Sequence, residues 1–229
     1  MGVDQKLTAR TYTIIAALAV FVGLPLLLYA LGDAPRRTVL KEVISILTLL
    51  AFFMMLGQYF LARSNETLLS LFKSYQIQKV HKYIAYTAVS MILIHPFLVV
   101  LPRFFEAGVM PSDAFVTMIS TLDSVGILLG LAAWFLLLVL AATAYFRKQL
   151  MRRLTHRYRG WRHFHGAMAV TFTVLALWHS IELGRHTDIA MSALVITLAL
   201  IGFLLLAGLY RGKEPSRPRS DRAAEGAST

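Results

Sequence analysis

The sequence contains no cysteine, and this absence removes several kinds of redox and metal chemistry. Without cysteine the chain forms no disulfide, offers no thiolate ligand to a haem and cannot hold a cysteine-ligated iron–sulfur cluster. The absence does not indicate a redox compartment. Histidine, with 7 copies, is the best transition-metal ligand that remains in the chain.

Charged residues are also scarce, at 15% of a chain that is 57% hydrophobic. The mean hydropathy of +0.64 exceeds what a soluble domain needs for its core and indicates an integral membrane protein. The net charge of +11 would suggest nucleic acid as the partner of a soluble protein. Here the basic residues gather at the ends of apolar segments, so we expect membrane lipid and no nucleic acid as the partner.

Six apolar segments of about 20 residues or slightly more are long enough to cross a bilayer. Backbone groups in lipid must hydrogen-bond within the segment, so the sequence predicts an all-α, six-transmembrane-helix bundle over residues 11–210. The first segment could instead be a cleaved signal peptide, although its apolar run exceeds a typical signal core. The six segments are Thr11–Leu31, Val39–Ala62, Lys79–Leu101, Ser124–Phe146, His163–Gly184 and Ile189–Tyr210.

The distribution of lysine and arginine predicts the orientation of the bundle. With the N-terminus inside, most basic residues fall on the cytoplasmic side, as the positive-inside rule requires. Both termini are then cytoplasmic, residues 1–10 form a short cytoplasmic N-terminus and the polar tail 211–229 is expected to be disordered. We expect a multi-pass protein of a bacterial inner membrane. The basic residues left outside are Arg36, Arg37, Lys41, Arg103 and Arg185.

Two of the segments each carry a pair of histidines fourteen positions apart: His81 and His95, and His165 and His179. Fourteen residues of helix rise about 21 Å and turn about 1400°, which returns to within roughly 40° of the starting direction. Each helix therefore presents two imidazoles on one face, at opposite membrane levels. An ionisable side chain inside a membrane needs a partner or a role, and the repeated spacing predicts that all four bind metal.

The chemistry of the four histidines favours haem over a single metal ion. Zinc and copper commonly require three or four converging ligands, whereas haem needs one axial ligand on each side of a flat ring. The prediction is two bis-histidine b haems, an inner one at His81 and His165 and an outer one at His95 and His179. Three cations at the inner boundary either pair with propionates of the inner haem or are ordinary interfacial anchors; they are Arg63, Lys82 and Arg162.

Four other positions in or near these segments have predictions of their own. His163 lies about 160° from His179 around the helix, so we expect it at the interface and not in the site. His186 would lie over the outer centre if the helix continued, or is exposed in a loop. Gln58 is expected to make an interhelical hydrogen bond, and Pro96 to kink its helix beside His95.

Two stretches, HKYIAYTAVSMILIHPF and WRHFHGAMAVTFTVLALWHS, resemble the ferric reductase-like transmembrane domain shared by ferric-chelate reductases, NADPH oxidases and bacterial relatives. The family's W-R-x-x-H run matches Trp161, Arg162 and His165. The resemblance implies that the four histidines ligate two b haems, in the same inner and outer pairs. Superoxide-forming members carry a further histidine where this chain has Val99, which disfavours oxygen as the acceptor.

The resemblance also implies a function and partners. NADPH oxidases carry FAD and NAD domains, which this sequence does not show, so we expect a separate cytoplasmic flavoprotein with FAD or FMN, or a ferredoxin-type reductase. Its docking site would be the basic loop 147–162, which is otherwise an anchor on anionic lipid. The chain would act as the membrane haem subunit of an oxidoreductase and pass electrons to an outer acceptor, foremost a ferric chelate.

Two alternatives remain open at this point. The first is the haem-binding membrane subunit of a periplasmic methionine sulfoxide reductase system, a family that lacks a histidine at the position of His81. The second is a haem-free small transporter or assembly factor whose histidines serve packing or proton transfer. The outer loops are slightly acidic, which would attract cationic species, through Glu106, Asp113, Asp123, Glu182 and Asp188.

Overall fold

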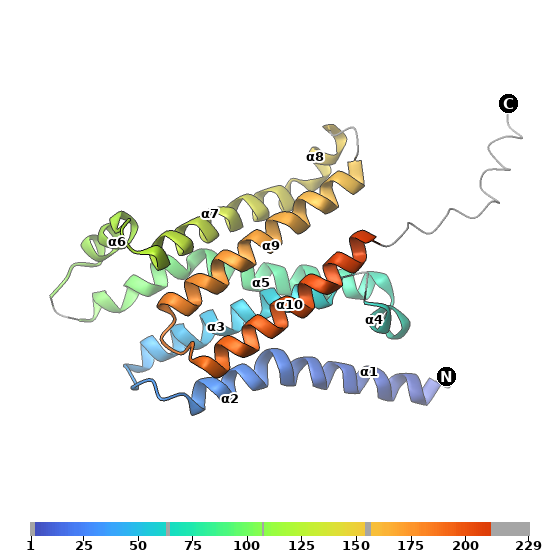
Figure 1. The fold of residues 1–229 in the computed structure, drawn as a ribbon, viewed down its shortest axis with the longest axis horizontal. Coiled ribbons are helices and arrows are strands. Elements are labelled where there is room, and N and C mark those ends of the chain that lie inside the picture. The colour runs from blue at the N-terminus through green and yellow to red at the C-terminus, as the bar shows by residue number, and fades with distance from the viewer. Residues whose placement is uncertain (1–2, 63–64, 107, 154–156, 212–229) are drawn as a thin grey trace, which may run out of the picture.

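The computed structural model describes residues 3–62, 65–106, 108–153 and 157–211. These residues form helices joined by short connections, and no strand occurs among them. By length and composition, 6 helices are long and apolar enough to cross a membrane, which confirms the predicted all-α, six-span class. Figure 1 shows these helices running side by side as an elongated bundle.

Each of the six spans ends within two residues of the predicted end of its segment. Three of them begin earlier than predicted, at Val3, Ser74 and Arg157, because polar residues at the membrane interface remain helical although they lower the local hydropathy. The spans are α1–η1–α2 (Val3–Leu18, Ala19–Gly23 and Leu24–Leu31), α3 (Val39–Phe60), α5 (Ser74–Val100), α7 (Val125–Tyr145), α9 (Arg157–Leu183) and α10 (Ile189–Arg211).

Shorter helices, which were not predicted, lie between the spans: α4 (Glu66–Leu71), the 3₁₀ turn η2 (Leu101–Phe104), α6 (Pro111–Ser120) and α8 (Arg147–Arg153). The stretch 147–162, predicted as a basic loop, is helical wherever the structure describes it, since α8 and the first turns of α9 occupy it. The prediction of a loop was therefore wrong, although the basic character of the stretch stands.

The first span contains a π-helical turn, η1, in which the N–H of Leu24 donates to the carbonyl of Ala19. The next residue is Pro25, which is fully buried and has no N–H for the turn before it. A π-turn is one way in which a helix accommodates such a break in the hydrogen-bond ladder. The span therefore continues to Leu31 as one membrane-crossing unit.

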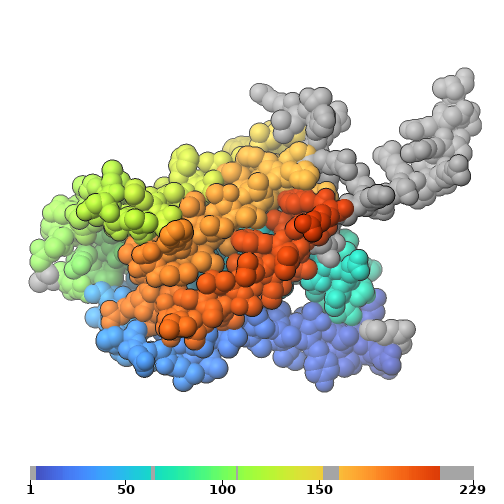
Figure 2. Space-filling model, in the orientation of Figure 1, coloured from blue at the N-terminus to red at the C-terminus, as the bar shows by residue number. Residues whose placement is uncertain are grey.

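Two pairs of helices, α3 with α5 and α7 with α9, are the most closely packed in the bundle. α3 packs closely against α5, α7 packs closely against α9, and α10 contacts both α3 and α9. In Figure 2, α10 lies between α9 and the first span on the face that is seen. The start of α1 and the end of α10 lie at the same end of the bundle, with α4 and α8, and α6 lies at the opposite end (Figure 1).

Two buried clusters hold the helices together. One joins α2, α3 and α10 around Phe53 and Leu56, and the other joins α7 and α9 around Leu137 and Phe172. A buried polar contact supplements them, because the hydroxyl groups of Tyr59 on α3 and Thr173 on α9 lie 2.8 Å apart and share a hydrogen bond. This contact joins the end of α3 to the part of α9 between His165 and His179.

Candidate functional site

The four histidines lie on two helices that face each other across the bundle. α5 carries His81 and His95, and α9 carries His165 and His179. At each level the two imidazoles are electrostatic neighbours, His95 with His179 and His81 with His165. α5 and α9 each pack against α7 and are not themselves a closely packed pair, so side chains span the room between them.

The imidazoles of His95 and His179, named the outer pair after the predicted orientation, have hydrogen-bond partners that identify their protonated nitrogens. Nδ1 of His179 lies 2.7 Å from the carbonyl oxygen of Gly126, which can only accept, so Nδ1 carries the proton. Nδ1 of His95 lies 3.2 Å from Oγ1 of Thr48. That hydroxyl donates its hydrogen to the carbonyl of Ile44 at 2.8 Å, so it accepts from His95. In both rings Nε2 is left with its lone pair, which is the form that binds a metal.

The inner level shows the opposite pattern. Among the described residues, Nδ1 of His165, Nε of Arg162 and Oε1 of Gln58 are buried without a hydrogen-bond partner. All three belong to the half of the bundle nearer the chain ends. Buried polar atoms are rarely unpaired in native proteins, so a bound group with polar and charged atoms fits this level.

Gln58 departs from its prediction. Its side-chain amide donates to the carbonyl of Met54, one turn earlier on the same helix, at 3.2 Å. The expected interhelical hydrogen bond is therefore wrong in this structure. A glutamine within a helix can satisfy its donor locally, which leaves its carbonyl oxygen free to face the interior.

The middle of the site is filled by apolar side chains. Ala88 lies halfway between His81 and His95, and Phe172 lies halfway between His165 and His179. Ala88 is 0% exposed and Phe172 is 2% exposed. Helix geometry puts a residue seven positions away close to the face of each histidine, so these two residues lie between the two levels.

The three cations predicted for the inner level differ in where the structure places them. Arg162 lies one turn before His165, its carbonyl accepts from the Tyr210 hydroxyl at 2.8 Å and its guanidinium lies 5.8 Å from the Tyr210 ring centre. Lys82 is exposed, with its ammonium 5.4 Å from the ring centre of Tyr86 on the same helix, away from the imidazoles. Arg63 lies outside the described residues.

Two other histidines are not brought to either pair. His163 is exposed and stacks on Tyr210 at 4.5 Å between ring centres. His186 stacks on Tyr29 at 3.9 Å, and both of its ring nitrogens are buried without a partner among the described residues. Burial lowers the pKa of His186, and neighbouring arginines lower it further while Glu42 opposes them. His186 therefore favours its neutral form.

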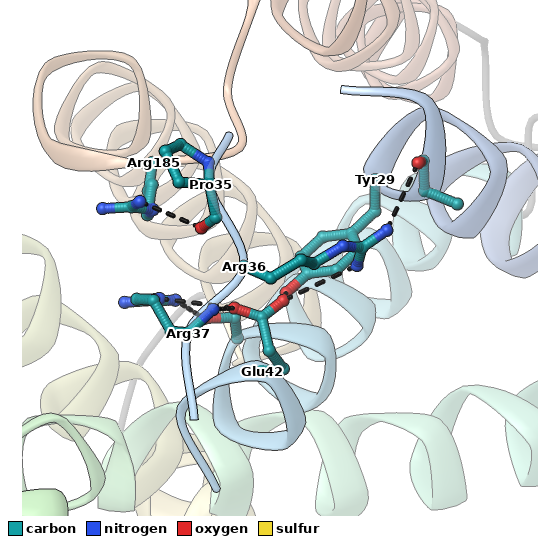
Figure 3. A network of polar contacts seen from close by, with 8 residues as sticks. Tyr29, Pro35, Arg36, Arg37, Glu42 and Arg185 are labelled. Atoms are coloured by element: carbon teal, nitrogen blue, oxygen red, sulfur yellow. Dashed lines mark hydrogen bonds and ion pairs between the residues drawn. The ribbon is translucent and has the colours of Figure 1, made fainter. Parts of the chain in front are cut away.

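A polar network around Glu42 ties the end of α2 to the start of α3 (Figure 3). The Tyr29 hydroxyl donates to Glu42 Oε2 at 2.6 Å, and Arg37 donates to Oε1 at 3.4 Å and to Ser45. Arg36 forms an ion pair with Glu42 at 3.8 Å. This network was not predicted from the sequence, although an acid in the first turn of a helix that follows two arginines was a usable signal.

Two acidic residues of the predicted outer loops, Glu106 and Asp188, are engaged within the protein. Glu106 accepts a hydrogen bond from Lys41 and lies 3.6 Å from Arg103, and the bond to Lys41 is the main cause of its lowered pKa. Asp188 caps α10 by accepting from the N–H of Met191 at 2.8 Å. These two carboxylates are therefore less free to attract a cationic species than the sequence suggested.

An open apolar groove of about 370 Å³ lies between α9 and α10, lined by Val174, Leu177, Trp178, Ile181 and Phe203. Its α9 residues centre on the face of that helix opposite His179. The groove is therefore separate from the imidazoles and belongs to the lipid-facing surface.

The donor set fits an axial pair at each level. Within the described residues, no three histidine, aspartate or glutamate side chains gather where they could hold one metal ion. One imidazole from each of two helices, surrounded by apolar walls, is instead the arrangement that a haem requires.

Comparisons with known proteins agree with this geometry. Residues 47–176 match a family model described as the ferric reductase like transmembrane component. The matched range includes His81, His95 and His165 and ends just before His179. An uncharacterised protein from Archaeoglobus fulgidus is 36% identical over 187 residues, which is 80% of this chain and all of that protein. No solved structure matches the chain.

Proposed function

We infer the function from one premise: the chain belongs to the family of ferric reductase-like transmembrane components. Domains of this family generally bind haem and act in electron transfer across a membrane, and this chain is a multi-pass membrane protein of that kind. The further proposals concern which residues hold the haems, which way electrons pass, and what receives them.

We propose that His81 and His165 ligate an inner b haem and that His95 and His179 ligate an outer one. The observation that carries this proposal is the pairing of one imidazole from α5 with one from α9 at each of two levels. It is supported by the outer hydrogen bonds, which leave Nε2 of both rings free for a metal. When bound, each haem iron supplies a centre that accepts and releases one electron.

The residues of the chain hold and insulate the two centres. The histidines of a pair would hold one haem, and the two levels are about 21 Å apart along the helices. Ala88 and Phe172 are buried apolar residues at positions between the two levels. Arg162, with its unpaired Nε, supplies a donor for a propionate at the inner level.

We propose that electrons enter at the end of the bundle where α1 begins and α10 ends, and that this end is cytoplasmic. The donor would be a flavoprotein that docks on the basic stretch 147–162. At the other end the acceptor would be a ferric chelate. An anionic chelate is proposed because Arg36 and Arg37 lie there beside Glu42 and Arg185 lies near His186, so several cationic groups are available to contact it.

The first test is an absorption spectrum of the purified protein, oxidised and dithionite-reduced, with haem quantified per polypeptide. We expect two low-spin b haems per chain. A colourless protein after expression with ample haem would overturn the proposal, and the paired histidines would then need an explanation in packing or proton transfer.

The second test concerns direction and acceptor. The protein is reconstituted in vesicles that enclose a reductant, and reduction of external ferric citrate is followed. We expect reduction that depends on the protein and on its haem. If reduced haem fails to reoxidise when ferric citrate is added, the ferric chelate proposal is wrong although the haem proposal would stand.

A further inference from the structure

We propose that α7, which carries none of the four histidines, orients the outer imidazole pair through three positioning residues, Gly126, Gly130 and Trp134. These residues follow one another at intervals of four, so they lie along one stripe of the helix. The inference rests on the proposed function, since it concerns how this chain aims two of the proposed haem ligands.

Gly130 makes room for the ring of His179. A Cβ atom at position 130 would lie 2.6 Å from both Nδ1 and Cε1 of His179, closer than real Cβ contacts allow. The imidazole therefore lies against the backbone of α7, at a place where any side chain would displace it. The glycine is required by this contact and not by a turn or an unusual backbone angle.

Gly126, one turn earlier, fixes the rotation of the same ring. Its carbonyl accepts from Nδ1 of His179 at 2.7 Å, so Nε2 on the far side of the ring points away from α7. A hydrogen bond from a ligating imidazole to a carbonyl also raises the basicity of the ligand, which favours ferric over ferrous iron. Gly126 and Gly130 together set both the aim and the electronic character of His179.

Trp134, one turn later, contacts the neighbouring helix α5. Its indole N–H donates to the carbonyl of Leu93 on α5 at 2.9 Å, two residues before His95. That carbonyl belongs to the turn preceding Pro96, where the proline has no N–H to complete the ladder. The indole thus braces α5 at its weakened turn, so the same stripe that aims His179 also positions the helix that carries His95.

The test uses the full-length, haem-loaded protein and three variants: Gly130→Ala, Trp134→Phe and a control, Gly57→Ala. At Gly57, also inside a span, the nearest atoms to an added Cβ would be those of the Phe21 ring, at ordinary contact distances of 3.7–3.8 Å. The readouts are haem per chain, the low-temperature electron paramagnetic resonance signal of each ferric haem, and a redox titration.

We expect Gly130→Ala to shift or abolish the outer haem's resonance and to raise its potential, while the inner haem keeps its signal. Trp134→Phe should shift the outer resonance less, and Gly57→Ala should leave both signals unchanged. If Gly130→Ala also loses the inner haem through misfolding, Trp134→Phe decides. Outer signals that match the control in both variants would overturn the inference alone. A wild-type protein without haem would overturn the proposed function and the inference with it.

Discussion

The outer and inner histidine pairs repeat one design in sequence and differ in their surroundings. At the outer level, each Nδ1 has an acceptor within the protein, Thr48 for His95 and Gly126 for His179. At the inner level, Nδ1 of His165 is buried without a partner among the described residues. The same spacing can therefore produce one site that the protein completes by itself and one that depends on what binds.

A glycine occupies each level, and the two glycines serve different neighbours. Gly130 admits the imidazole of His179 itself, whereas Gly166 admits the hydroxyl of Tyr210, which bonds to the backbone of α9. The outer glycine acts on a candidate ligand, and the inner one acts on the position of a helix. The difference indicates that the outer imidazoles are held more rigidly before any haem binds.

The largest effect should come from removing one ligand at each level. We expect His179→Ala and His165→Ala each to reduce haem from about two to about one per chain, because an axial pair is lost, and to stop electron transfer across vesicles. The control is His163→Ala, which lies two residues from His165 but stacks on Tyr210. Haem quantified per chain in the purified variants checks this expectation. Loss of both haems in His179→Ala would show that the two levels are not independent.

A smaller effect should follow from breaking the outer hydrogen bond alone. Thr48→Val keeps the side-chain shape and removes the acceptor for Nδ1 of His95, so we expect outer haem retention to weaken roughly 10–100-fold. Thr48→Ser, which keeps the hydroxyl, should retain the wild-type behaviour. Haem transfer to apomyoglobin measures the loss at each level, and equal losses at the inner and outer levels would contradict the comparison.

The hydrogen bond between Tyr59 and Thr173 lies between the two histidine levels, so its loss should not distinguish one haem from the other. Tyr59→Phe removes the hydrogen bond to Thr173, which contributes about 1 kcal/mol to stability. We expect a lower thermal midpoint with both haem spectra unchanged. If the spectrum of one haem shifted and that of the other did not, Tyr59 would act on the shifted level alone, which would contradict this prediction.

The smallest effect concerns pH at the outer end. The pKa of His186 is lowered from its ordinary value of 6.5, so the unfolded chain takes up a proton at a higher pH than the folded one. The contribution of His186 to stability is therefore complete above about pH 6.5 and declines as the pH falls below it. Thermal unfolding between pH 8 and pH 5 should show a shallower decline for His186→Asn than for wild type, and parallel curves would contradict this assignment.

Much of the fold and part of the site could be predicted from the sequence. The six spans followed from hydropathy, and the two histidine faces followed from helix geometry. The resemblance to the ferric reductase-like family was confirmed by the family match over residues 47–176. The orientation of the bundle, the haems and the partners stay predictions.

The remainder depended on contacts between helices that no periodicity encodes. Gly130 is an ordinary glycine in an apolar run until the ring of His179 is placed against it, and Gln58 bonds within its own helix against expectation. The helical stretch 147–153 was read as a loop because its charges carry no apolar pattern. Such features arise from tertiary placement, which a single sequence does not reveal.

The start of α1 and the end of α10 lie at one end of the bundle, the end at which α5 and α9 present His81 and His165 (Figure 1). For protein engineering, this means that a redox domain or a photosensitiser fused at either terminus is delivered to the same face as the inner pair. Fusions at both termini would bring two reporters together there, so energy transfer between two fluorophores would monitor the integrity of the bundle from outside the lipid.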